Sequence, residues 1–430
     1  MSLINADYEI RRFEPAAPGE PGYPEATAWD SAVSFGFHEE RSSDERVQES
    51  IARSRVDGAV YTGAYQTGQP APHSLGSDVP VATFGTQPST LNIGFGRLLD
   101  AHLITGVTVR TSHRRRGLLR RMMTEDLTLA KGNGIAIAAL TASEASIYGR
   151  FGFGVATSEQ SITVDTSAKF RLDHLPVGSV EVADPKVLLE LAPQVFARLH
   201  GEQPGSIGRQ EFYRQLAAGA SSREGGPDAK VKAALHYAPD GSVDGYVSYR
   251  FGGWDKTPAT MEIVDLVAAT PAAYLELWQY LAAIDLVERV TWNEAPSDNP
   301  LTWALTDPRC VSATNPRDLL WLRILDVRQA LEARQFATDG AVVLRVTDGL
   351  SLTAGTFSLK VQGGTAQVTE SASAPDLDLD IAALSSIYLG AVNPVSLAAA
   401  NKVRENTSGA AFLAARLFAV ERPAHCLTHF

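Results

Sequence analysis

Apolar positions in the first third of the chain follow two periods, which predict alternating strands and helices. Residues 107–110 read as a strand, and from Leu118 onward an apolar stripe recurs with the spacing of an amphipathic helix, at Leu119, Met122, Met123, Leu127 and Ala130. Residues 132–134 (Gly-Asn-Gly) tolerate a left-handed conformation and predict the end of this helix. The apolar run 135–140 then predicts a buried parallel strand. This order is a βαβ unit, which indicates an α/β fold.

The same order of elements recurs between residues 245 and 292. Strands are predicted at 245–250, 262–267 and 287–292, with a helix that starts at Thr270 and Pro271 between the second and the third. Threonine is a favoured N-cap residue, and proline suits the first helical position. The pattern leaves two interpretations open, a coincidence of two βαβ units or an internal duplication. We infer a duplication from the shared order of elements. We call it degenerate because the second copy lacks the basic loop of the first.

The last part of the chain, from about residue 311, has a different pattern. A strand-like run at 320–326 leads into a helix at 327–334, and helical spacing returns at 381–389 and 410–417. Alternating segments separated by glycine predict antiparallel hairpins at 341–346, 349–354 and 356–361. A chain of 430 residues is too long for one ordinary core. The predicted domains are α/β and α+β in class and cover 1–160, 161–310 and 311–430.

Composition and charge narrow the class of protein. The net charge of −11 argues against general nucleic-acid binding and favours cationic partners. No stretch approaches the roughly 18 apolar residues of a membrane span, and residues 1–12 lack the apolar core of a secretory signal. Cys310 and Cys426 give neither a metal-ligand spacing nor a disulfide framework. A cytoplasmic protein without a metal site is the resulting expectation.

The strongest chemical signal is the basic loop between the strand at 107–110 and the helix from Leu118. Gly117 permits close approach of a ligand, and the N–H groups of residues 115–120 converge at a helix start, where anions bind. The flanking arginines add positive charge. The loop has neither the Lys-Ser/Thr of a P-loop nor a dinucleotide fingerprint. It therefore predicts a diphosphate site, and a solvated basic helix start is the alternative.

Two motifs resemble those of the Gcn5-related N-acetyltransferases (GNAT). Arg114-x-x-Gly117-x-Leu119 resembles the family's Arg/Gln-x-x-Gly-x-Gly/Ala signature, with Leu119 in place of a small residue. Residues 147–153 resemble the family's aromatic-Tyr-x-x-x-Gly-Phe pattern, with Tyr148 at the tyrosine. The resemblance implies acetyl-CoA as cosubstrate, its diphosphate on the loop and its pantetheine along a splayed strand. The implied contacts are Val107, Thr108, Val109, Arg114, Arg115, Arg116, Gly117, Leu118, Leu119, Arg120, Ser143 and Glu144.

The resemblance also implies a catalytic role for Tyr148. The family's tyrosine lies near the thioester sulfur and protonates the departing CoA thiolate. A phenol with a pKa of about 10 can donate this proton as the tetrahedral intermediate collapses. An aromatic residue that only packs is the alternative for Tyr148.

Further motifs are similar to those of the mycobacterial enhanced intracellular survival (Eis) acetyltransferases. They lie at 113–120, 143–144, 147–153, 320–323, 388–391 and 397–401. This resemblance covers most of the chain and implies tandem GNAT domains, the second one degenerate, followed by a sterol-carrier-like domain. It also implies a homo-hexamer and acetylation of primary amines, such as those of aminoglycosides and lysine.

In the Eis family the general base is the carboxylate of the last residue, which here is Phe430. The reference pKa of such a carboxyl is about 3.5, and burial would raise it. The apolar tail 423–430 favours an ordered end over a frayed one. The chain departs from the family pattern at His429, where relatives often have an acid, and in the loop 35–40, which lacks the family's aspartate. The expected acceptor contacts are Phe37, His38, Glu39 and His429.

These features predict an acetyl-CoA-dependent N-acetyltransferase that acts on cationic amines by direct transfer. The alternative is a non-catalytic protein that binds a lipid or another protein and in which CoA is structural or regulatory.

Overall fold

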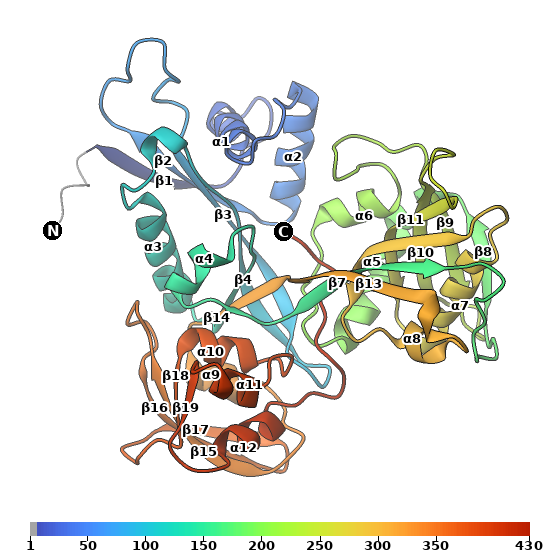
Figure 1. The fold of residues 1–430 in the computed structure, drawn as a ribbon. Coiled ribbons are helices and arrows are strands. Elements are labelled where there is room, and N and C mark those ends of the chain that lie inside the picture. The colour runs from blue at the N-terminus through green and yellow to red at the C-terminus, as the bar shows by residue number, and fades with distance from the viewer. Residues whose placement is uncertain (1–6) are drawn as a thin grey trace.

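The computed structural model describes residues 7–430, which form three β-sheets with helices packed against them (Figure 1). The sheet of the N-terminal part has the order β1-β2-β3-β4-β5-β14-β6. Its strands are β1 (Tyr8–Phe13), β2 (Val60–Gln66), β3 (Ala82–Asn92), β4 (Leu98–Val109), β5 (Ile137–Thr141), β14 (Leu320–Ile324) and β6 (Gly154–Val155). Its helices are α1 (Tyr23–Gly36), α2 (Asp44–Val56), α3 (Leu118–Gly132) and α4 (Ala145–Tyr148), with 3₁₀ turns at Thr111–His113 and Gly149–Phe151.

The central part has a second sheet of order β13-β7-β12-β11-β10-β9-β8. Its strands are β13 (Val311–Asp318), β7 (Ser158–Asp165), β12 (Arg289–Pro296), β11 (Thr260–Ala268), β10 (Val243–Phe251), β9 (Lys232–Tyr237) and β8 (Ser179–Ala183). Its helices are α5 (Leu188–Glu202), α6 (Glu211–Ala217), α7 (Pro271–Ala282) and α8 (Pro300–Ala304), with 3₁₀ turns at Pro185–Val187 and Pro308–Cys310.

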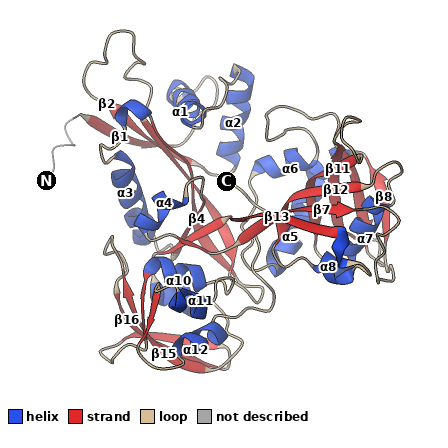
Figure 2. Ribbon diagram, viewed as in Figure 1, coloured by secondary structure: helices blue, strands red, loops and turns tan. Residues whose placement is uncertain are grey.

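The C-terminal part has a third sheet of order β17-β16-β15-β18-β19, and Figure 2 shows its helices gathered beside this sheet. Its strands are β15 (Gly340–Thr347), β16 (Gly355–Gln362), β17 (Thr365–Glu370), β18 (Leu377–Asp380) and β19 (Val403–Glu405). Its helices are α9 (Val327–Ala333), α10 (Ile381–Ile387), α11 (Pro394–Ala399) and α12 (Ala410–Leu417).

Helix α3 has the position and the buried face that its sequence predicts. It begins after Gly117, which has φ +76°, and ends at Gly132. The apolar stripe packs into the core of the N-terminal part at Leu118, Met122, Met123, Leu127 and Ala130. Strand β5 follows and pairs in parallel with β4, so the predicted βαβ unit is confirmed.

Two chain crossings tie the N-terminal and central sheets together. Strand β7 follows β6 in sequence but lies in the central sheet between β12 and β13. Strand β14 follows β13 but lies in the N-terminal sheet between β5 and β6, as its orange ribbon among the blue-green strands shows (Figure 1). Both β7 and β14 are inner strands of the sheet that the chain enters at each crossing. The division into domains at residues 160 and 310 stays a prediction. Residues 311–324, which it assigns to the third domain, form β13 of the central sheet and β14 of the N-terminal sheet.

The N-terminal and central sheets share one plan, in agreement with the inferred duplication. In each sheet a helix, α3 or α7, connects two parallel strands. The parallel pairing is equally short in both: Ala101–Leu103 with Ile137–Ala139, and Thr260–Glu262 with Arg289–Thr291. Beyond these pairs the two strands of each sheet diverge. A gap at corresponding places in the two sheets follows from this geometry.

The prediction of a strand at residues 349–354 is wrong. This segment is a loop between β15 and β16, and the predicted hairpin pairs β15 directly with β16. The Asp348 carboxylate accepts hydrogen bonds from the backbone N–H groups of Leu350, Leu352 and Thr353, which holds the loop in a turn. Asp348 also forms a buried ion pair with Arg323 of β14, 2.7 Å long, so the loop anchors the C-terminal part to the N-terminal sheet.

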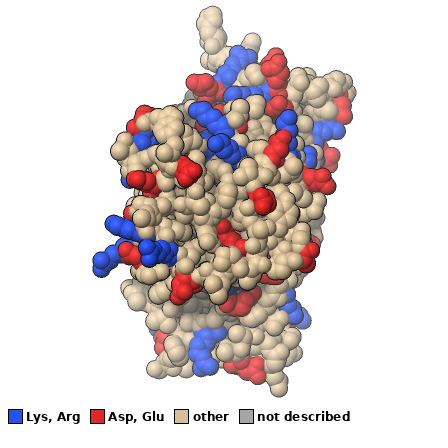
Figure 3. Space-filling view, turned by 90° about the vertical axis from the view of Figure 1, so that its right-hand side faces the viewer, with Lys and Arg blue, Asp and Glu red and all other residues tan. Residues whose placement is uncertain are grey.

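Two observations on residues 7–430 concern possible membrane and nucleic-acid contacts. No helix among residues 7–430 is long and apolar enough to cross a membrane. On the face drawn in Figure 3, basic and acidic side chains are interspersed between wide uncharged areas.

Candidate active site

The gap beside β4 creates the candidate active site. The parallel pairing of β4 and β5 ends at Leu103 and Ala139, although β4 continues to Val109 and β5 to Thr141. On its other side β4 stays paired with β3, where the Thr83 hydroxyl donates to the carbonyl oxygen of Gly106 at 2.8 Å. Backbone groups on the open side of β4 are therefore free to pair with an extended ligand, as an added strand would.

A cavity of about 330 Å³ occupies this gap. The two chain crossings, α4 and the end of the chain all contribute to its wall. It is lined by Phe37, Ile104, Thr105, Gly106, Val107, Thr141, Ala142, Ser143, Tyr148, Glu159, Arg317, Asp318, Leu319, His429 and Phe430. The structure thus brings the two residues with expected catalytic roles, Tyr148 and Phe430, into one cavity.

The basic loop has the geometry of an anion site. Gly117 is left-handed, as is Arg115 with φ +62°, and α3 begins without a side-chain cap, which leaves its first N–H groups available. Arg114, Arg116 and Arg120 are all exposed, and a hydrogen bond of 2.6 Å from the Arg116 guanidinium to the Tyr8 hydroxyl holds Arg116 in place. The Leu118 side chain is buried in the core, so only its backbone N–H is suited to contact a diphosphate.

The corresponding helix of the central part is closed to an anion. The Thr270 hydroxyl caps α7 by accepting from the N–H of Ala273 at 3.2 Å, and it donates to Asp244 at 2.7 Å. Pro271 at the first helical position supplies no N–H. A diphosphate that approached this helix would also meet the buried Asp244 carboxylate. The duplicated unit has therefore lost the anion site, as the sequence predicts.

Tyr148 lies at the end of α4 with its ring against Phe153, the two centroids 6.3 Å apart. Burial raises the pKa of the Tyr148 phenol above its usual value of about 10, although a hydrogen bond with Ser143 acts in the opposite direction. The phenol therefore stays protonated at neutral pH, as a proton donor requires.

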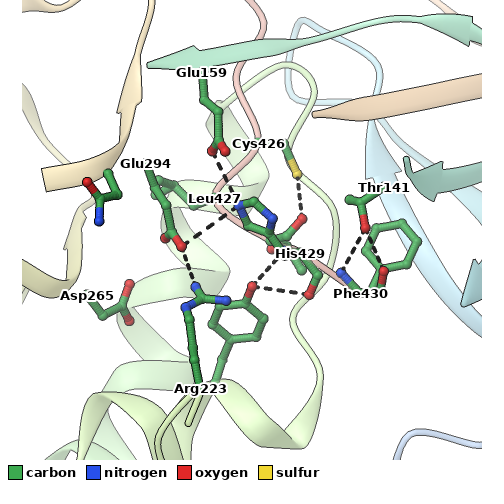
Figure 4. Close-up of polar contacts among 12 residues, drawn as sticks. Thr141, Glu159, Arg223, Asp265, Glu294, Cys426, Leu427, His429 and Phe430 are labelled. Atoms are coloured by element: carbon green, nitrogen blue, oxygen red, sulfur yellow. Dashed lines mark hydrogen bonds and ion pairs between the residues drawn. The ribbon is translucent and has the colours of Figure 1, made fainter. Parts of the chain in front are cut away.

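The chain end is threaded between the N-terminal and central parts, where Figure 1 marks it with C. Residues 424–428 are buried. Hydrogen bonds to backbone carbonyl oxygens hold this tail. The N–H of His425 donates to the carbonyl of Pro204 at 2.8 Å, and the Thr428 hydroxyl donates to the carbonyl of Ile207 at 3.0 Å. At the last residue, the Thr141 hydroxyl donates to a terminal oxygen of Phe430 at 2.6 Å (Figure 4). The end of the chain is ordered rather than frayed.

His429 lies between two carboxylates of the central part (Figure 4). Its Nε2 atom is 3.3 Å from an oxygen of Glu159 and 3.8 Å from an oxygen of Glu294. Burial raises the pKa of Glu159, but His429 and Arg317 more than offset this, so the pKa lies below its usual value. Burial raises the pKa of Glu294, and the opposing charges of Arg223 and His429 do not cancel the effect. Two glutamates that are distant in sequence thus supply negative charge beside His429.

Three of the other expected contacts, His38, Glu39 and Glu144, lie outside this cavity. His38 and Glu39 are exposed and are absent from the residues that line it, and Glu39 lines a neighbouring cavity of about 440 Å³ beside α1. Phe37 does line it, from the end of α1. Glu144 is exposed at the start of α4, where it accepts a hydrogen bond from the Ser146 hydroxyl. Within residues 7–430 no group of three or more His, Cys, Asp or Glu side chains is placed to hold a metal ion.

Comparison with known proteins agrees with this architecture. Residues 27–156 and 205–324 each match the model of an acetyltransferase (GNAT) domain, and residues 327–427 match that of a sterol carrier protein domain. The N-acetyltransferase Eis of Mycobacterium tuberculosis is 36% identical over 345 residues, which cover 75% of this chain and 82% of that protein. The chain belongs to the Eis-type GNAT acetyltransferases.

Two further relatives match a larger share of the chain. An uncharacterized N-acetyltransferase of Streptomyces avermitilis is 35% identical over 399 residues, 91% of this chain and 93% of that one. The crystal structure of Eis1 from Mycobacterium abscessus has a TM-score of 0.80 at 27% identity and covers 98% of this chain and 100% of that one. The chain is thus an N-acetyltransferase of tandem GNAT and sterol-carrier architecture, and GNAT domains use acetyl-CoA as cosubstrate.

Several cavity residues of this Eis-type chain escaped the sequence analysis: Thr141, Glu159, Arg317 and the adjoining Glu294. Thr141 had a usable signal, because it ends a buried parallel strand, and ligands in α/β folds gather at that edge. Glu159 and Arg317 lie where the chain crosses between the sheets, and no local pattern predicts the crossing.

Proposed function

We propose that the chain transfers the acetyl group of acetyl-CoA directly to a primary amine of a cationic acceptor. The proposed general base is the terminal carboxylate of Phe430, and the proposed general acid is Tyr148. The observation that carries this proposal is that both groups line one cavity at the open side of β4.

The proposed reaction needs two proton transfers at opposite ends of the transferred group. The reacting amine enters the step in its neutral form, and its nitrogen forms the new C–N bond with the thioester carbon. The Phe430 carboxylate receives the proton that this nitrogen loses as the amide forms. N–H groups on the open side of β4 stabilise the oxyanion of the tetrahedral intermediate. The C–S bond then breaks, and Tyr148 donates its proton to the departing thiolate. The base gains one proton and the acid loses one, so the enzyme returns to its initial state by exchange with solvent.

The charges around the cavity support a cationic acceptor. Two carboxylates, Glu159 and Glu294, lie beside the cavity, where each forms an ion pair with one arginine, Arg317 or Arg223. The end of the chain adds a third carboxylate, and the whole chain carries a net charge of −11. We place aminoglycoside-like polyamines and lysine side chains among the candidate acceptors. A homo-hexamer in the cytoplasm completes the proposal by analogy with the Eis family.

A thiol-release assay tests the proposal. The purified chain is incubated with acetyl-CoA and a panel of monoamines, polyamines, aminoglycosides and lysine peptides, and free CoA is measured. We expect turnover with polycationic amines and loss of turnover when one glycine is added after Phe430, because the carboxylate is then displaced by one residue. Full activity of the extended chain would exclude Phe430 as the base. Binding of CoA without turnover on any amine would instead support a non-catalytic binding protein.

A further inference from the structure

Tyr213 of α6 forms two hydrogen bonds with the backbone of His429. Its hydroxyl accepts from the N–H of His429 at 2.6 Å and donates to the His429 carbonyl oxygen at 3.2 Å. We propose that Tyr213 is a positioning residue that fixes the Phe430 carboxylate for proton transfer. This inference rests on the proposed role of Phe430 as the base. It gives the central part, which has lost its own anion site, a function in the chemistry of the N-terminal part.

The tyrosine is itself held rigidly. Tyr213 is 2% exposed, and the guanidinium of Arg209 lies over its ring, 4.4 Å from the centroid. Arg209 forms a bidentate ion pair with Asp265, with distances of 2.7 and 2.8 Å, and also contacts the Tyr246 hydroxyl at 3.1 Å. Asp265 and Tyr246 lie on inner strands of the central sheet. Through Arg209 they hold the Tyr213 ring in a fixed position relative to that sheet.

The same network reaches the tail at a second point. Arg209 donates to the carbonyl oxygen of Leu427 at 3.5 Å, two residues before His429. Burial raises the pKa of the Tyr213 phenol to about 12, with Arg223 acting in the opposite direction, so its hydroxyl keeps its proton across the working pH range. The side chain of His429 contacts Glu159 and Glu294, but the bonds from Tyr213 are to its backbone.

The position of these bonds explains why they matter for the base. Thr141 of the N-terminal part holds Phe430, and Tyr213 of the central part holds the preceding residue. Two anchors on consecutive residues fix both the place and the direction of the carboxylate, whereas one anchor leaves it free to rotate. A misplacement of a catalytic group by about 1 Å can lower the rate about 100-fold. Loss of either anchor is therefore expected to lower kcat.

The test compares two variants that each lose one buried phenol hydroxyl. Tyr213→Phe keeps the packing against Arg209 and removes both bonds to His429, together with the polar contact between the hydroxyl and Arg223. Tyr249→Phe is the matched control, because the Tyr249 hydroxyl bonds only that of Tyr280 among the contacts described and Tyr249 is likewise buried in the central part. We expect Tyr213→Phe to lower kcat about 10- to 100-fold with an unchanged dissociation constant for acetyl-CoA. The control retains the kcat of the wild type.

A double variant separates this inference from the role of the base. Where the chain is extended by one glycine after Phe430, Tyr213→Phe should cost less than about twofold, since there is no placed base left to misalign. A wild-type kcat for Tyr213→Phe would overturn the positioning role and leave the base intact. Full activity of the extended chain alone would instead remove the base. An equal loss in both backgrounds would show that Tyr213 acts on stability rather than through Phe430.

Discussion

The Thr141 hydroxyl donates a hydrogen bond of 2.6 Å to a terminal oxygen of Phe430, although 289 positions separate the two residues. Thr141 ends β5, and its hydroxyl also accepts from the N–H of Phe430 at 3.3 Å. One side chain of the N-terminal sheet thus contacts both ends of the last residue. The contact ties the chain end to the gap between β4 and β5, which is the proposed place of acetyl transfer.

Replacement of Thr141 by valine tests this contact. The change keeps the shape and removes the bond to the carboxylate, so we expect kcat/KM for the amine to fall about 10- to 100-fold, the worth of a hydrogen bond to a charged group. Steady-state kinetics with saturating acetyl-CoA measure it. Thr128→Val removes a comparable hydroxyl bond on the exposed side of α3 and serves as the control. Equal kinetics of the two variants would contradict a role for Thr141.

Replacement of Tyr148 by phenylalanine tests the proton donor. Loss of general acid catalysis is expected to lower kcat about 100- to 10,000-fold and to leave binding of acetyl-CoA intact, because the ring remains. Calorimetric titration measures the binding, and thiol release measures the rate. The raised pKa of Tyr148 also predicts that activity is not lost through ionisation of this phenol at moderately alkaline pH. Unchanged turnover of the variant would remove Tyr148 from the mechanism.

Replacement of Gly117 by alanine tests the anion site. The glycine has φ +76°, where an L-residue costs about 1–2 kcal/mol, so the loop is expected to shift and the KM for acetyl-CoA to rise several-fold. Gly134→Ala is the matched control, because this glycine has φ +82° and follows the other end of the same helix. The control loses similar stability without a change in this KM. A wild-type KM for Gly117→Ala would argue against the diphosphate at this loop.

The buried histidines beside the tail predict a decline of stability in mild acid. Burial lowers the pKa of both His200 and His425 to about 4, from 6.5 in an unfolded chain. Well above pH 6.5 the two histidines are neutral in both the folded and the unfolded chain. As the pH falls below 6.5, they are protonated in the unfolded chain before they are protonated in the folded one. The free energy of unfolding therefore falls as the pH drops from 6.5 towards 4, by roughly 1.4 kcal/mol per histidine between pH 7.5 and 5.5.

Urea unfolding at pH 7.5 and 5.5 measures this decline. His425→Gln stays neutral at both values and is expected to lose about half of the difference that the two histidines produce. His38→Gln, at an exposed position, is the control and should keep the wild-type difference. An undiminished difference in His425→Gln would show that this histidine is not the source.

Local patterns carried much of the fold. Helical spacing predicts α3 and α12, with glycine at both ends of α3 and Gly409 before α12, and α7 begins at a Thr-Pro pair that caps it. The strand expected at 349–354 failed because Asp348 binds the backbone that a strand would have left for its neighbours. A single carboxylate can thus outweigh an alternating pattern of only six residues.

The sequence by itself located the candidate groups of the N-terminal part, in the basic loop before α3 and in the tyrosine motif at Tyr148, and it predicted the repeated βαβ order. These features are local, because capping, period and glycine conformation act over a few residues. Only the tertiary structure decided what surrounds the end of the chain. The chain crossings from β6 to β7 and from β13 to β14 bring Glu159 and Arg317 to the cavity, and the crossing of the tail brings His429 to Tyr213. Contacts between residues more than a hundred positions apart depend on how the sheets pack, and no short pattern encodes them.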